Sequence, residues 1–276
     1  MTKSEKHAFP FSRATLVVLG LVMSVALALV SAVNVMASDE NGTFPFGPGE
    51  RSLYEIRWGL IPAGQAELVV LPTADRDGAP AWHFQLTIRT NDFVDVFYKV
   101  RDKIDSYAEL SLQGSLLYRK SQKEGRSLRE EVVSFDQVKN LALYSNHGEV
   151  SQPLALIPGT IDPLTAVFFI RTQPLSENLD IVKSITDGKK NVTGVARVLN
   201  RERLVVNGST YDTFRVEPDL REVGGVFEKS AKSRITLWFT ADARRLLMKI
   251  EGKVVVGAFT GTLLESGLGA DAAVKD

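Results

Sequence analysis

The sequence predicts a mainly β protein in which an antiparallel sheet curls into a barrel or half-barrel around one main short helix. Residues 81–90 (AWHFQLTIRT) alternate apolar and polar side chains with the two-residue period of a half-buried strand. The pair Asn207-Gly208 between two strand-like runs favours the type I′ turn of a tight hairpin. Short strand-like runs recur at regular spacing along the chain, which is typical of curled antiparallel sheets.

The first 37 residues are typical of an export signal. The cationic residues Lys3, Lys6 and Arg13 precede an apolar run at 14–30, and the small residues that follow permit cleavage after Ala37. We therefore expect a periplasmic protein of the bacterial cell envelope. The length of the apolar run leaves open the alternative of an uncleaved inner-membrane anchor.

The composition limits what the exported part can bind. The chain has no cysteine, which excludes disulfides, a lipidated signal cysteine and thiolate metal sites. Removal of residues 1–37 leaves 30 basic against 32 acidic residues, a net charge close to −2. This balance gives no reason to expect nucleic-acid binding or strong attraction to anionic lipid. Contact with a membrane is expected only through an uncleaved signal.

The exported part divides into three segments. Residues 38–50 are rich in Gly, Pro and small polar residues and read as a linker. Residues 51–265 carry the strand-like runs and form one β-rich domain, and residues 266–276 form a flexible C-terminal tail.

The sequence predicts a series of hairpins in the first half of the domain. Runs at 51–58 and 65–71 flank a turn, and the strand at 81–90 follows. A turn or helical piece around 93–98 leads into a strand with many charges. A hairpin joined at Gly125 pairs runs 116–124 and 127–136, with long polar side chains expected on its outer face. A weaker strand at 140–146 turns at His147 and Gly148.

The main helix is expected at 163–172. Asp162 provides a capping side chain and Pro163 occupies the first helical position, where its missing N–H is tolerated. The apolar content of this segment indicates burial, with Phe168 as a core residue. The strands of the second half are expected at 179–186, 192–200, 203–206, 210–218, 233–240, 245–253 and 254–265.

Motifs for established chemistry are missing from the sequence. His83 and His147 have no suitably spaced carboxylate partners, so we expect no metal site. The stretch TADRDG imitates the start of a calcium loop, but its first and twelfth ligand positions hold Thr73 and Phe84, and we interpret it as a hairpin turn. No nucleophile elbow, phosphate loop or dinucleotide fingerprint occurs, and no cofactor is expected.

Two groups of residues are candidate binding sites. The charged strands carry Arg101, Arg119 and Arg129, which would bind a carboxylate or phosphate if they pointed into one concavity. The simpler interpretation is a solvated sheet face with paired charges.

The second group is aromatic, with one acidic residue. It consists of Tyr54, Trp58, Tyr98, Trp238, Phe239 and Asp242. Its members could form a ligand platform, but rings on strands are more often core, and we expect Trp238 to be a core residue. Asp242 fits a turn in which its carboxylate caps backbone amides.

Four stretches resemble a bacterial family called domain of unknown function 3108. They are LYEIRWGLIPAGQAEL, FYKVRDKIDSY, DPLTAVFFIRTQPL and ITLWFTADARRLLMKIEGKVVVGAFTGTL. The resemblance covers roughly residues 51–264. It implies an exported, β-rich envelope protein and implies no reaction. Leu247 departs from the family pattern, in which we expect proline at this turn.

Two functions are expected from these observations. The first is a non-enzymatic binding or scaffolding module for a lipid-like or peptidic partner, because curled sheets often enclose apolar cavities. The alternative is a hydrolase or lyase that acts on envelope polymer with carboxylates such as Asp102, Asp105 and Asp242. Scattered carboxylates would weaken the second hypothesis, and an empty apolar cavity would favour the first.

Overall fold

The structure is a computed structural model that describes residues 44–76, 78–219, 234–254 and 257–268. The predicted export signal and the tail beyond residue 268 lie outside the described residues, as does the first part of the predicted linker.

The first half of the domain forms a meander of antiparallel strands, with one short helix between β3 and β4. The elements are β1 (Glu50–Trp58), β2 (Ile61–Arg76), β3 (Ala79–Thr90), α2 (Asp92–Asp95), β4 (Val100–Glu109), β5 (Ser115–Glu124), β6 (Ser127–Asp136), β7 (Leu141–Asn146), β8 (Glu149–Val150) and β9 (Leu154–Ala155). The last two are short strands that both pair with β7.

The second half begins with the predicted helix and continues as another meander. Its elements are α3 (Pro163–Thr172), β10 (Asp180–Thr186), β11 (Asn191–Val206), β12 (Ser209–Pro218), β13 (Arg234–Thr240), β14 (Leu247–Val254) and β15 (Gly257–Leu268). The hairpin predicted at Asn207-Gly208 joins β11 to β12, and both residues have the positive φ that a type I′ turn requires.

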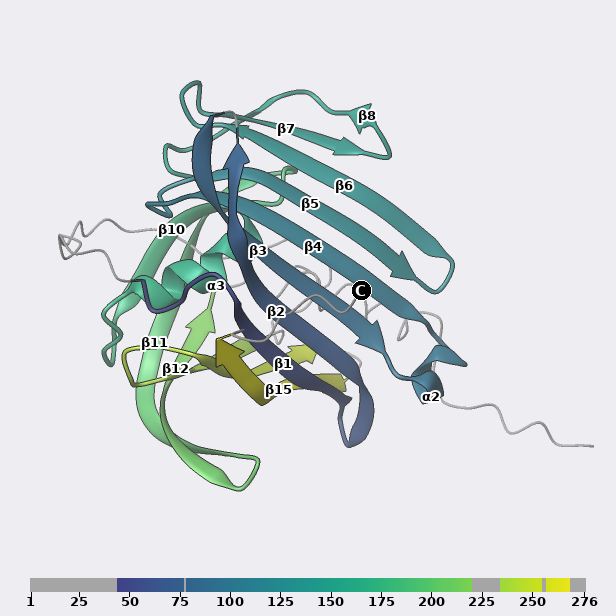
Figure 1. Cartoon of the computed structure of the whole chain (residues 1–276), viewed down its shortest axis with the longest axis vertical. Coiled ribbons are helices and arrows are strands. Elements are labelled where there is room, and N and C mark those ends of the chain that lie inside the picture. Colours follow the sequence, from purple (N-terminus) through teal and green to yellow (C-terminus); the bar gives the residue numbers. More distant parts are fainter. Residues whose placement is uncertain (1–43, 77, 220–233, 255–256, 269–276) are drawn as a thin grey trace, which may run out of the picture.

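All the strands belong to one sheet, which is antiparallel throughout its named pairs. The two meanders join where β1 pairs with β15, so the N-terminal and C-terminal parts of the domain lie side by side (Figure 1). Strand β10 ends one side of the strand order and β8 ends the other, and these two are not neighbours. The sheet is therefore open and corresponds to the predicted half-barrel.

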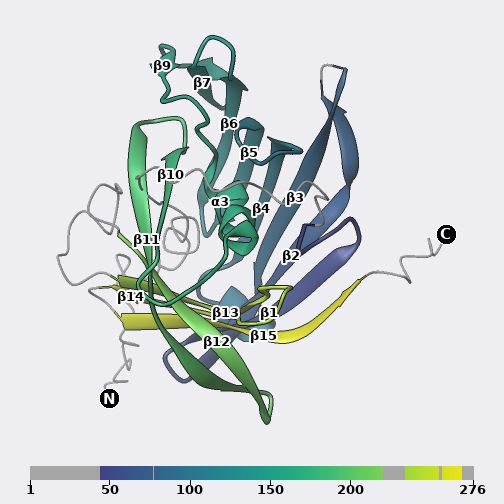
Figure 2. The same ribbon diagram turned by 90° about the vertical axis from the view of Figure 1, so that its left-hand side faces the viewer.

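Helix α3 lies inside the curve of the sheet. Figure 2 shows it between β10 and β11 on one side and β3 and β4 on the other. Its first turn is fixed by Asp162, whose carboxylate accepts hydrogen bonds from the backbone amides of Leu164 and Thr165 and from the hydroxyls of Ser106 and Ser115. The helix is thus attached to β4 and β5, and the prediction of its bounds is confirmed.

An aromatic cluster packs the helix onto the sheet. The ring of Phe168 stacks on Phe84 of β3 with 3.8 Å between centroids, and Phe46 meets both rings edge-on. Phe46 precedes the first strand and is buried, and Gly49 donates a backbone hydrogen bond to Val70. Residues 44–49, which the sequence analysis assigned to the linker, are therefore packed on the core.

Two local expectations differ from the structure. The runs predicted at 192–200 and 203–206 form one strand, β11, because a bulge between Val198 and Asn200 keeps it paired with β12. The polar side chains of β5 are not all on the outer face. Lys120, Gln122 and Glu124 alternate with exposed neighbours and are buried on the inner face.

Candidate functional site

An apolar cavity of about 70 Å³ lies between α3 and the inner face of the sheet. We call it the α3 cavity. It belongs to a wider cleft whose empty space, including the part open to solvent, is about 710 Å³. Its walls come from both meanders and from the helix. The lining residues are Tyr54, Ile56, Ala66, Leu68, Leu86, Ile104, Tyr118, Pro163, Leu164, Val167, Leu237, Leu247 and Ile250.

The two tyrosines of the α3 cavity contribute mainly their rings. The hydroxyl of Tyr54 donates a hydrogen bond of 2.9 Å to the carbonyl oxygen of Leu247, so it is occupied by the wall itself. Burial raises the pKa of both Tyr54 and Tyr118 above the ordinary value, which keeps both phenols neutral. The lining is therefore uncharged and suits a hydrocarbon group.

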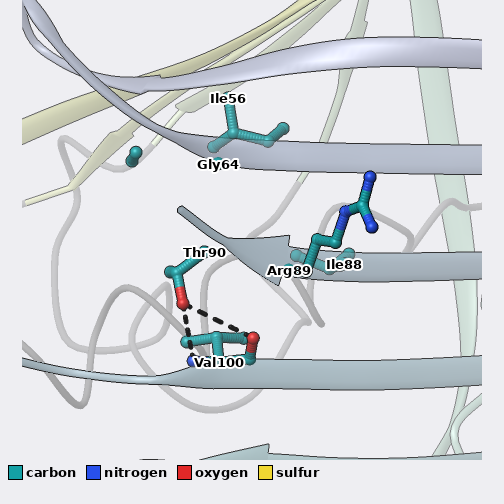
Figure 3. A pocket seen from close by; sticks show the side chains of 7 residues that line it. Ile56, Gly64, Ile88, Arg89, Thr90 and Val100 are labelled. Carbon is teal, nitrogen blue, oxygen red and sulfur yellow. Dashed lines mark hydrogen bonds between the residues drawn. The ribbon is translucent and has the colours of Figure 1, made fainter. Parts of the chain in front are cut away.

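A smaller cavity of about 20 Å³ lies nearer the ends of β2, β3 and β4 (Figure 3). Ile56 lines both cavities, so the two are neighbours. Gly64 lies in the wall where β2 passes β3, and a β-carbon there would lie 2.8 Å from the Cα atom of Thr90. Thr90 closes this wall by bonding to the backbone of Val100. Glycine is needed here because the two backbones approach closely.

The inner face changes from apolar to polar further along β4 and β5. Asp102 and Glu124 are buried and share a hydrogen bond, and the amide of Gln122 donates to Glu124 over 2.8 Å. Burial and then the neighbouring charge of Asp102 raise the pKa of Glu124 to about 7. Burial also raises the pKa of Asp102. One proton is therefore shared by this pair near neutral pH.

A further buried carboxylate, Glu131 on β6, has a pKa shifted in the opposite direction. It accepts hydrogen bonds of 2.6 Å from both Lys120 and Lys189 and one of 2.8 Å from the hydroxyl of Tyr144. Burial opposes ionisation, but the two ammonium groups outweigh it and lower the pKa of Glu131 to about 2. Lys189 lies in the β10–β11 turn, so this ion pair holds that turn against β6.

The three arginines predicted as an anion-binding wall do not converge. Arg119 is opposite Asp105 and Val132 on the outer face, whereas Arg129 is opposite Gln122 on the inner face. Arg101 shares the outer face with Lys123, and its guanidinium bonds to Asp95 over 2.5 Å. The pleat therefore separates Arg129 from the other two arginines, and four residues along the strands separate Arg101 from Arg119. The sequence alone did not reveal this register.

The predicted aromatic group is spread over the fold. Trp58 is partly buried against the core near one end of the sheet. Trp238 is buried on the outer face, where its indole N–H donates to Glu202 over 2.6 Å and Lys249 lies over its ring. Tyr98 lies beside Gly125 at the β5–β6 turn, and burial raises its pKa to about 12.

Asp242 occupies the turn between β13 and β14. Its carboxylate accepts hydrogen bonds from the hydroxyl of Thr240 and the backbone amides of Arg244 and Arg245. Partial burial raises its pKa, but the bond from Thr240 and the charge of Arg244 outweigh this and leave the pKa lowered. The geometry is that of an Asx turn, as the simpler interpretation of the sequence expected.

Neither a metal cluster nor a membrane-crossing helix occurs in the described part of the chain. No group of three or more His, Asp or Glu residues there is arranged to hold a metal ion. No helix within the same residues has the length and apolar content to cross a membrane.

The fold and the α3 cavity define a class of protein, an open, curled antiparallel sheet that encloses a helix and an apolar cavity. The chain belongs to the family described as protein of unknown function (DUF3108), whose pattern matches residues 53–264. No curated protein matches the sequence.

Solved structures that are similar to this one include the following two. The first is a β-barrel-like protein of the domain of unknown function DUF1849 from Brucella abortus, with a TM-score of 0.53 and 8% identity over 79% of this chain and 97% of that chain. The second, from Bacteroides fragilis, is named a "putative exported protein with YmcC-like fold" and has a TM-score of 0.32 and 8% identity over 81% and 98% of the two chains. The first similarity supports the fold.

Sequence reasoning missed the inner polar group of Asp102, Glu124 and Glu131 as a unit. Asp102 was grouped with Asp105 and Asp242 as a candidate carboxylate, and Glu124 was assigned to a polar outer face. A signal was present, because β5 has polar residues at every position from 119 to 124 and a strand in a curled sheet must direct half of them inward.

Proposed function

We propose that this protein is an exported, non-enzymatic binding module of the cell envelope that holds the apolar chain of a lipid-like molecule in the α3 cavity. The cavity itself is the observation that carries the proposal. Thirteen residues line it, and they present hydrocarbon and two neutral phenol rings. Sites for small molecules are typically concave and mostly apolar, with a few polar groups that fix orientation.

The volume of the cavity limits how a ligand enters. A cavity of about 70 Å³ is roughly half the size of an engineered cavity of about 150 Å³ that binds benzene. In this conformation it accepts the end of a chain, and the rest of a longer ligand would lie in the wider cleft of about 710 Å³.

The polar part of the inner face suits the other end of such a molecule. Tyr118 lines the cavity, and Lys120 and Gln122 follow on the same face of β5. Arg129 lies opposite Gln122 and is partly exposed. An apolar chain in the cavity would therefore place a polar head group beside hydrogen-bonding side chains of both charges, because Asp102 and Glu124 lie on this face together with Gln122 and Arg129.

A hydrolase or lyase has less support. The carboxylates considered from the sequence lie apart, because Asp102 is on the inner face, Asp105 is on the outer face and Asp242 is in a distant turn. Asp105 is engaged by His83 and Gln85 over 2.9 and 2.8 Å. A peptidic ligand is the other partner expected from the sequence, and the uncharged lining of the cavity favours the lipid-like one.

The proposal is tested by filling the cavity. Ala66 lines it from β2, so Ala66→Leu places three extra carbons in the empty space, whereas Ala79→Leu adds the same group at an exposed position. We expect Ala66→Leu to fold and to lose binding of a fluorescent fatty acid, and Ala79→Leu to bind it like the wild type. Equal binding by both variants would place the ligand elsewhere.

A further inference from the structure

Five large apolar side chains are exposed at one end of the half-barrel. Leu60, in the β1–β2 turn, and Ile61, the first residue of β2, are 89% and 40% exposed. Phe93, Val96 and Phe97 come from α2 and its C-terminal side and are 61%, 78% and 50% exposed. We call these five residues the apolar rim. The two segments lie at the same end of the sheet in Figure 1.

The apolar rim is held together by Asn91. Its side-chain amide donates to the carbonyl oxygen of Pro62 over 2.8 Å, and its backbone amide donates to Ala63 over 2.9 Å. The same side chain caps α2 by accepting a hydrogen bond from Val94. The rings of Phe93 and Phe97 meet with 5.7 Å between centroids. The exposed groups therefore form a fixed platform, and clustered apolar groups of this kind mark interaction sites.

Basic side chains surround the apolar rim. Those near the same strand ends are Arg57, Arg89, Lys99, Arg101, Lys123 and Arg126. The register places Arg89 opposite Arg101 and Arg101 opposite Lys123, and the backbone amide of Gly125 bonds to Lys99, so the β5–β6 turn lies at this end too. Glu55 pairs with Arg57, and Asp95 pairs with Arg101 and Lys99. Asp102 and Glu124 also lie at these strand ends but are buried on the inner face, so basic residues outnumber acidic ones on the outer surface of this end. The balanced charge of the whole chain thus conceals a basic end.

The smaller cavity in Figure 3 lies next to this basic end, because Ala63, Gly64 and Thr90 line it and adjoin the β1–β2 turn and α2. Ile56 forms a wall of both this cavity and the α3 cavity. Apolar side chains within a ring of cations match the interface of a bilayer with anionic head groups, where rings and aliphatic groups enter and basic groups meet phosphate.

We propose that the apolar rim docks on the surface of an anionic phospholipid bilayer. The docking stands on the rim and its charges alone and does not depend on the proposed function. The chemistry that recognises the partner is the phosphate of the head groups and the hydrocarbon beneath them.

The absence of cysteine from the chain makes a direct test possible. Single substitutions Leu60→Cys and Val96→Cys accept a polarity-sensitive fluorophore on the rim of the full chain. Val138→Cys is the matched control, because Val138 is 94% exposed in the β6–β7 turn at the opposite end of the strands. Vesicles of phosphatidylglycerol and phosphatidylethanolamine are added to each, and vesicles of phosphatidylcholine serve as the uncharged comparison.

We expect a blue shift and roughly a twofold rise in emission for the labels at 60 and 96 with phosphatidylglycerol, and little change at 138 or with phosphatidylcholine. An equal response at all three positions would overturn the proposal, because it would show adsorption without orientation. A response that depends on protein concentration without vesicles would also overturn it and would indicate pairing of two copies. Silent rim labels together with fatty acid binding that Ala66→Leu abolishes would refute the docking and leave the proposed function intact.

Discussion

Arg171 at the end of α3 and Glu50 at the start of β1 form a buried, bidentate ion pair, with Nη1 2.5 Å from Oε1 and Nη2 3.0 Å from Oε2. Arg171 is also bonded to the carbonyl oxygens of Pro45 and Arg244, and its guanidinium lies over the ring of Phe46. One side chain therefore joins the helix to the N-terminal segment and to the β13–β14 turn. These contacts fix the C-terminal end of α3, whereas Asp162 fixes its N-terminal end.

Removal of one partner of this pair should be strongly destabilising. Arg171→Met leaves the carboxylate of Glu50 buried without its counter-charge, and the free energy of unfolding should fall by about 3–5 kcal/mol. Urea unfolding followed by circular dichroism measures this. Arg197→Ala, which removes an exposed ion pair with Asp180, should change stability by less than about 1 kcal/mol. Similar small effects for both variants would refute the structural role of Arg171.

The aromatic residues predicted as core should also matter for stability. Phe168→Ala removes a fully buried ring that stacks on Phe84 and meets Phe46 edge-on, and Trp238→Ala removes a buried ring on the outer face. Each substitution should lower the free energy of unfolding by about 3–5 kcal/mol, because transfer energy is lost and a cavity is created. Arg119→Ala and Arg126→Ala, at exposed positions, should lie within about 0.5 kcal/mol of the wild type. Unchanged urea midpoints for the aromatic variants would contradict this assignment.

The pair of Asp102 and Glu124 should make stability depend on pH. The folded pKa of Glu124, about 7, is above that of the unfolded chain, so its favourable contribution is complete below about pH 4.5 and is lost as the pH rises through 7. The unfolding free energy should therefore fall by roughly 1–3 kcal/mol over this interval. Thermal unfolding at several pH values should show the fall in the wild type.

Glu124→Gln should abolish most of this fall, because the amide replaces the protonated acid. Glu131→Gln is the contrasting variant. The pKa of Glu131 is lowered to about 2 by its two lysines, so its contribution is present above about pH 4.5 and is lost only as the pH falls toward 2. The free energy of unfolding of Glu131→Gln should therefore still fall between pH 4.5 and 7. A persistent slope in Glu124→Gln would assign the titration to another group.

Gly64 should resist substitution because β2 and β3 approach closely at this position. A β-carbon in Gly64→Ala would collide with the carbonyl oxygen of Arg89, so the strands must separate, at a cost of about 1–3 kcal/mol. Gly47→Ala is the control, since a β-carbon there meets nothing within 4 Å. Chemical unfolding of both variants measures the difference. Equal stability would show that the strands already lie further apart in solution.

The features that the sequence predicted depend on nearby residues. The helix at 163–172 follows from Asp162 and Pro163 in adjacent positions, and the strand at 81–90 follows from its own alternation. The turn at Asn207-Gly208 is set by two residues. These signals act over a few residues, so a single sequence contains them in full.

The features that the sequence did not predict depend on register between distant strands. The pairing of β1 with β15 joins residues about two hundred positions apart, and no local pattern encodes it. The pKa of Glu124 is raised because the register buries it on the inner face and places Asp102 two residue pairs further along the strands, and the sequence of this polar strand does not show which face is inner. The α3 cavity could not be predicted from the sequence either, because the same apolar residues could also pack into a filled core.

The most direct test of the central claim is native mass spectrometry of the protein purified from its own envelope, with wild type and Ala66→Leu side by side. If a lipid-like molecule binds in the α3 cavity, the wild type should carry one additional mass that organic solvent releases. Ala66→Leu should have the mass of the protein alone. A wild type without bound mass, or a lipid retained equally by Ala66→Leu, would contradict binding in the α3 cavity.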